Sequence, residues 1–119
     1  MKEGSRILIV DKDSNFRALV GEAMDANGYH SIGTDNLQEA LTLIDKADAD
    51  AAIVGLDMPP MSGMKLLHKV KAEHPGFPII LVAESTRTYS IHDILSADFD
   101  AFLSKPIDLE HLIGAAKQL

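Results

Sequence analysis

Short apolar runs alternate along the chain with longer segments in which apolar side chains recur at helical spacing. The run at residues 7–10, Ile-Leu-Ile-Val, is continuous and mostly β-branched, which is typical of a strand buried on both faces. Beyond it, apolar residues repeat every three or four positions from Phe16 to Met24, and this spacing indicates one face of a helix. Ser14 or Asp13 is the expected N-cap of that helix, and Gly28 lies just past its end.

The same alternation continues to the end of the chain. Further strands are predicted at 29–34, 51–56, 78–82 and 101–103, and the strand starts near residues 6, 29, 51, 78 and 100 leave room for a helix after each strand. These helices include one capped by Asn36, one stopping near His74, a short one around 91–95 and a last one over 109–119 capped by Asp108. Repeated βα units predict an α/β fold with a parallel sheet covered by helices on both faces.

Composition narrows the class of protein further. The chain has 119 residues, of which 46% are apolar, so we expect a single domain spanning 1–119. It has no cysteine, which excludes disulfides, thiol nucleophiles and cysteine-ligated metals. The formal net charge of −7 argues against binding to nucleic acid or to an anionic membrane surface. No apolar run approaches the about 20 residues that span a bilayer, so a cytoplasmic location is expected.

Polar residues follow the predicted strand ends, where α/β proteins carry their functional crevice. Asp11 follows the first strand, Asp57 opens a Pro-rich loop at 57–63 after the third, and Lys105-Pro106 follows the fifth. Together these three elements resemble the receiver domain of two-component response regulators. The resemblance implies a flavodoxin-like (βα)5 three-layer sandwich with strand order 2-1-3-4-5, in which Lys105-Pro106 is often a cis peptide. It also implies a pocket in which an acidic pair binds Mg²⁺ and an aspartate accepts phosphate.

The chain departs from this family pattern at the phosphorylation site. In the family, the Met-Pro and the glycine of the loop follow the phosphoacceptor at set distances, and these place the acceptor position at Gly55, which has no carboxylate. The second acid of the metal-binding pair is replaced by Lys12, and the hydroxyl residue that ends the fourth strand is replaced by Ala83. The resemblance therefore implies a degenerate pocket made of Asp11, Lys12, Asp13, Gly55, Asp57, Ala83 and Lys105.

These substitutions change the charge of the pocket in the same direction. The loss of the acceptor carboxylate and the gain of Lys12 both make the pocket less negative, and Mg²⁺ normally relieves that negative charge. We expect the Lys12 ammonium to pair with Asp11 or Asp57 in place of a metal; the alternative is that Lys12 extends into solvent. No cofactor is expected, and Mg²⁺, if bound, would be held by Asp11 and Asp57. The five histidines lie on different elements without ligand-like spacing, so no metal site is expected from them.

The resemblance also implies an interaction surface built from the fourth helix, the fifth strand and the fifth helix. Receivers often dimerise or bind partners there. In this sequence the expected face comprises Tyr89, Ile91, His92, Ile94, Phe102, Ser104, Pro106 and His111.

The sequence as a whole predicts an atypical bacterial receiver rather than an enzyme. It would act in two-component or phosphorelay signalling through contact with a histidine kinase, an output domain or another regulator, without aspartyl phosphorylation and without contacting nucleic acid or a membrane. Two alternatives stay open: phosphorylation at a displaced acceptor, Asp57, and binding of a small ligand in the altered pocket.

Overall fold

The structure is a computed structural model that describes residues 1–58, 63–84 and 98–119. The strands of the described part are β1 (Arg6–Val10), β2 (His30–Thr34), β3 (Ala51–Gly55), β4 (Ile79–Ala83) and β5 (Ala101–Ser104). Its helices are α1 (Ser14–Ala26), α2 (Leu37–Asp45), α3 (Gly63–Glu73) and α5 (Leu109–Lys117). The short helix predicted around 91–95 lies outside the described residues.

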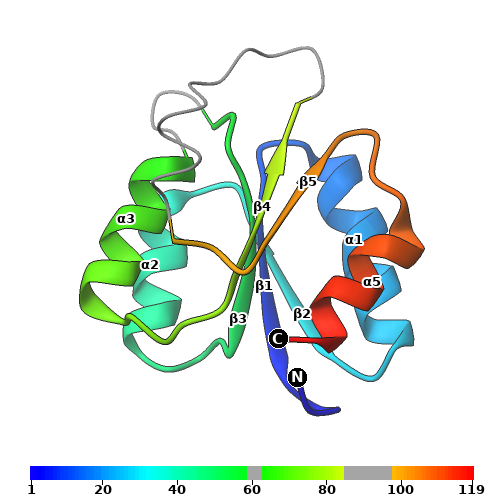
Figure 1. The fold of residues 1–119 in the computed structure, drawn as a ribbon, viewed down its shortest axis with the longest axis horizontal. Helices are drawn as coiled ribbons and strands as arrows, with labels where there is room; N and C mark the ends of the chain where they lie inside the picture. The colour runs from blue at the N-terminus through cyan, green and yellow to red at the C-terminus, as the bar shows by residue number, and fades with distance from the viewer. Residues whose placement is uncertain (59–62, 85–97) are drawn as a thin grey trace.

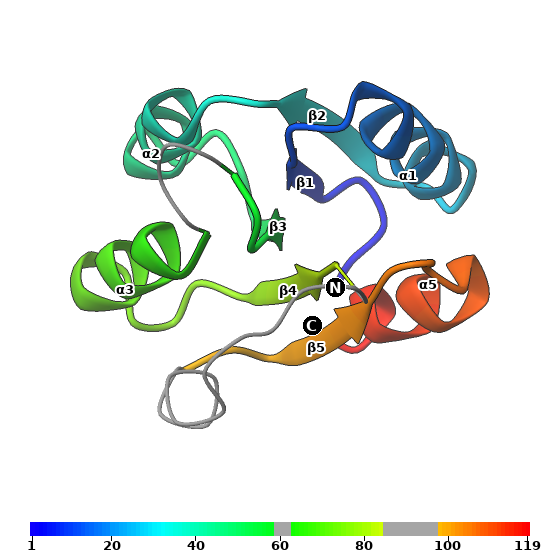
Figure 2. The ribbon, with the colours of Figure 1, turned by 90° about the horizontal axis from the view of Figure 1, so that it is seen from above.

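The strands form one parallel sheet in the order β2-β1-β3-β4-β5, which confirms the predicted topology. Helices α1 and α5 cover one face of the sheet, and α2 and α3 cover the other, as the view along the layers shows (Figures 1 and 2). The protein is therefore a three-layer α/β sandwich.

Two apolar clusters, one on each face of the sheet, hold the layers together. Leu8 and Val10 of β1 pack in the cluster under α2 and α3, whereas Ile7 and Ile9 pack in the cluster under α1 and α5. This division follows from the alternation of side chains along a strand. All residues of β3 and β4 are buried, because both strands lie inside the sheet and under helices on both faces.

The helix starts agree with the caps that the sequence predicts. Of the two candidates for α1, Asp13 is the N-cap, and its carboxylate accepts hydrogen bonds from the backbone N–H groups of Asn15 and Phe16. Asn36 and Asp108 cap α2 and α5 as predicted. In the described part of the chain, no helix is both long and apolar enough to cross a membrane.

Candidate functional site

The carboxyl ends of four neighbouring strands meet at one edge of the sheet. β1 leads directly into Asp11, β3 ends at Gly55, β4 ends at Ala83 and β5 leads into Lys105. The backbone N–H of Lys105 donates to the carbonyl of Ala83 at 2.8 Å, which places the start of the β5–α5 loop against the end of β4. The topology thus brings together residues that lie far apart in the sequence.

Asp11 is the buried anion of this edge, with only 3% of the residue exposed. Its Oδ2 lies 3.2 Å from the Nζ of Lys105 and its Oδ1 lies 3.3 Å from the same atom. The Oδ1 atom also accepts a hydrogen bond from the backbone N–H of Asp13 at 2.9 Å. These contacts hold the Asp11 carboxylate in one orientation, as is usual for a buried charge that is paired and hydrogen-bonded.

Gly55 allows the Asp11 carboxylate to occupy this position. A Cβ atom added at residue 55 would lie 2.6 Å from Oδ2 of Asp11, closer than a Cβ atom approaches its neighbours, and 3.1 Å from its Cγ. The start of α3 also lies close to the end of β3, because the N–H of Gly63 donates to the carbonyl of Leu56 at 3.0 Å. The space that a side chain at residue 55 would need is therefore filled by the Asp11 carboxylate.

Lys105 has more partners than the sequence pattern indicates. Its Nζ lies 3.2 Å from Oε1 of Glu84 and 4.3 Å from the centre of the Phe16 ring, and its side chain is 16% exposed. Burial by itself lowers the pKa of Lys105, but the charge of Asp11 and hydrogen bonds to Asp11 and Glu84 outweigh it and raise that pKa above the ordinary value. Sequence reasoning missed Glu84, although its place directly after Ala83 at the end of β4 was a usable signal.

Lys12 forms the second ion pair of the site. Its Nζ lies 3.3 Å from Oδ2 of Asp57, so of the two expected partners the structure selects Asp57. The Lys12 side chain is 49% exposed and that of Asp57 is 16% exposed, which places this pair at the rim of the pocket. Asp13 follows Lys12 in the chain and is the N-cap of α1, one of the two candidates that the sequence predicts.

Only part of the predicted interaction face falls within the described residues; Tyr89, Ile91, His92 and Ile94 lie outside them. Phe102 is partly buried and its ring centre lies 5.9 Å from that of Phe99. Ser104, Pro106 and His111 are exposed, and the Lys105–Pro106 peptide is cis. The predicted role of this face stays a prediction.

Comparison with known proteins gives a consistent result over nearly the whole chain. Residues 7–117 match the family model of the response regulator receiver domain. The chain is 30% identical over 106 residues to a cyclic di-GMP phosphodiesterase of Thermotoga maritima, an alignment that covers 89% of this chain and 28% of that protein. It is 30% identical over 112 residues to the DNA-binding transcriptional regulator NtrC of Rhizobium meliloti, covering 93% of this chain and 23% of that regulator.

Solved structures of response regulators superpose on this chain over nearly its whole length. A CheY-like response regulator receiver domain protein from Methanospirillum hungatei superposes with a TM-score of 0.86 at 27% identity, covering 97% of this chain and 92% of the other. The response regulator TrrA of Thermotoga maritima, solved in complex with Mg²⁺ and BeF, superposes with a TM-score of 0.84 at 25% identity, covering 96% and 97%.

Proposed function

Because this chain belongs to the response regulator receiver domain family, we propose that it is a receiver without aspartyl phosphorylation, which signals through contact with other proteins. The observation that carries the proposal is the position of the Asp11 carboxylate, 2.6 Å from where the Cβ of residue 55 would lie. An acyl phosphate needs a carboxylate nucleophile at the carboxyl end of β3. Residue 55 supplies none, and a neighbouring carboxylate occupies the space where that nucleophile would attach to the backbone.

The two lysines take over the charge balance that a divalent cation provides in the family. Lys105 forms ion pairs with Asp11 and Glu84, and Lys12 forms one with Asp57. Mg²⁺ requires several oxygen ligands in near-octahedral geometry. The donor set of this pocket does not fit it, because one family ligand position carries an ammonium group and both remaining carboxylates already pair with a lysine. We therefore assign no step to a metal.

The signalling output in this proposal is a protein contact. The partner is a histidine kinase, an output domain or another regulator, and a second copy of the chain bound through the β5–α5 side is a further form of the same contact. The chain spans less than a third of the length of both relatives described above, 28% and 23%. Domains such as those that complete these relatives are therefore candidates for the output partner.

The experiment is an attempt to phosphorylate the purified chain. We would incubate it with Mg²⁺ and acetyl phosphate, and separately with Mg²⁺ and beryllofluoride, and record intact mass and backbone amide spectra. TrrA, which forms a complex with Mg²⁺ and BeF, is the positive control under the same conditions. We expect no mass increase and no amide shifts near Asp11 and Asp57, even at millimolar Mg²⁺.

A stoichiometric phosphoryl adduct would overturn the proposal. If that adduct disappears in Asp57→Asn, the acceptor has moved two residues along the loop and the domain is a phosphorylated receiver. If Mg²⁺ alone shifts the amides of Asp11 and Asp57, the lysines do not replace the metal, and the charge argument is wrong.

A further inference from the structure

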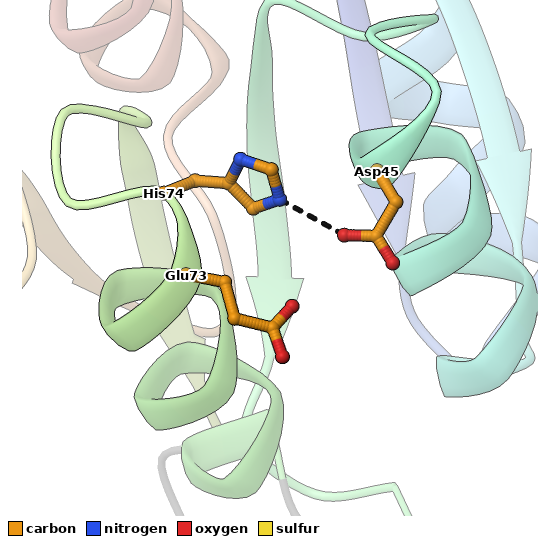
Figure 3. A group of neighbouring side chains, drawn as sticks. All are labelled: Asp45, Glu73 and His74. Carbon is orange, nitrogen blue, oxygen red and sulfur yellow. Dashed lines mark hydrogen bonds and ion pairs between the residues drawn. The ribbon is translucent and has the colours of Figure 1, made fainter.

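Three metal-ligating side chains converge at the opposite end of the molecule from the pocket. Asp45 is the last residue of α2, Glu73 is the last residue of α3, and His74 follows it directly. Their ligand atoms all lie within 4.8 Å of one another, and Nε2 of His74 lies 2.9 Å from Oδ1 of Asp45 (Figure 3). Because each helix runs back along the sheet, these helix ends lie at the edge away from Asp11 and Lys105.

The electrostatics of this group favour a cation. Among the described residues, Glu73 forms no ion pair and the only one of Asp45 is with His74, whose imidazole is charged only when protonated. Two carboxylates thus lie close together without a lysine or arginine between them. Each helix adds a partial negative charge of about −0.5 at its carboxyl end, and both of these ends lie at the cluster.

The donor set also selects the kind of cation. One imidazole nitrogen with two carboxylate oxygens suits Zn²⁺ and similar transition-metal ions, whereas Mg²⁺ and Ca²⁺ prefer oxygen ligands alone. We propose that Asp45, Glu73 and His74 form a surface site for a divalent transition-metal ion of the Zn²⁺ type. Water completes the coordination, since the side chains of Asp45 and His74 are 53% and 35% exposed.

The position of the site gives it a structural consequence. α2 and α3 lie side by side on one face of the sheet (Figure 2), and a bound ion cross-links their carboxyl ends. Because binding occurs to the folded state, the ion raises the stability of the domain as its concentration rises. The site shares no residue with the phosphorylation pocket, so the proposal stands or fails independently of the proposed function.

The test is a Zn²⁺ titration of the tag-free protein in a buffer without chelators. Binding would be followed by competition with a chromophoric zinc indicator and by the ¹⁵N shift of the His74 ring. We expect one Zn²⁺ per chain, a large shift of Nε2 of His74, and an affinity at least about tenfold lower in His74→Ala, since a direct ligand is lost. His68→Ala removes an exposed histidine from α3, the helix that ends next to His74. It is the matched control and is expected to bind as the parent does.

A second variant covers the case in which His74→Ala disturbs the end of α3. Asp45→Asn keeps a hydrogen-bonding side chain of the same size on α2 and is expected to weaken Zn²⁺ binding as well. The proposal is overturned if His74→Ala and His68→Ala bind Zn²⁺ equally, if the His74 ring does not shift, or if Mg²⁺ binds with the same affinity as Zn²⁺.

Discussion

Gly55→Ala tests whether the position of the Asp11 carboxylate depends on the absence of a Cβ atom at residue 55, at the end of β3. The added Cβ would lie 2.6 Å from Oδ2 of Asp11, so the carboxylate has to retreat and its contact with Nζ of Lys105, now 3.2 Å, has to lengthen. The backbone at Gly55 does not require a positive φ, because only Gly4 and Gly28 among the described glycines have one. Any destabilisation therefore comes from the side-chain contact and not from backbone strain.

The expected size follows from two opposing effects. Weakening a buried hydrogen bond between charged groups lowers the free energy of unfolding by about 1.5–3 kcal/mol. Replacing glycine by alanine raises it by about 0.4–1 kcal/mol, because the unfolded chain has lower entropy. We expect Gly55→Ala to lower the free energy of unfolding by about 1–2 kcal/mol. Urea unfolding followed by circular dichroism measures this value.

A double-mutant cycle isolates the contact. In an Asp11→Ala background there is no carboxylate for the new Cβ to displace, so Gly55→Ala should be neutral or slightly stabilising there. Gly114→Ala in α5 is the control, since a Cβ at residue 114 has no heavy atom within 4 Å, and it should stabilise by up to about 1 kcal/mol. The reasoning is refuted if Gly55→Ala has the same effect with and without Asp11.

Two further predictions concern the pH dependence of stability. Lys105→Met leaves the Asp11 charge buried without its main partner and should cost about 3–5 kcal/mol near pH 7. Because the pKa of Lys105 is raised in the folded state, its contribution is fully present below the ordinary lysine value of 10.5 and is lost as pH rises through the raised pKa. The difference in unfolding free energy between parent and variant should shrink in that alkaline range; a difference that stays constant there contradicts the ion pair. Asp50 is the acidic counterpart, because the pKa of its carboxyl group is lowered. The main cause is the backbone N–H of Arg6, which donates to Oδ2 of Asp50 at 2.7 Å; burial opposes this effect, and the Arg6 side chain adds to it. Asp50→Asn should cost about 1 kcal/mol at pH 7, and urea unfolding should show this cost disappearing as pH falls below 3.8 and through the lowered pKa; an equal cost at pH 7 and pH 2 would show that charge is not the cause.

The order of strands and helices was predictable from local patterns, because burial on both faces produces continuous apolar runs and burial on one face produces helical spacing. The caps Asn36 and Asp108 were predictable for the same reason, since a cap interacts with its own helix. Element ends were less well defined: the strand predicted at 51–56 ends at Gly55, and the last helix ends at Lys117 instead of at residue 119. An apolar repeat is defined by the residues inside a helix or strand, and the first and last residues of the element add little to it. The repeat therefore locates the ends of an element poorly.

The sequence by itself also determined which residue types stand at the strand ends, including glycine at the end of the third strand and lysine beside Asp11. Only the tertiary structure decided what those residues contact. It placed the Asp11 carboxylate in the space beside Gly55, paired Lys12 with Asp57 instead of with Asp11, and added Glu84 to the partners of Lys105. It also brought His74 to Asp45, from which it is separated by a strand and a helix. The physical reason is that hydrophobic periodicity reports the surroundings of one segment, whereas a partner for a charge is chosen by distance and side-chain direction between segments that meet only when the sheet has formed.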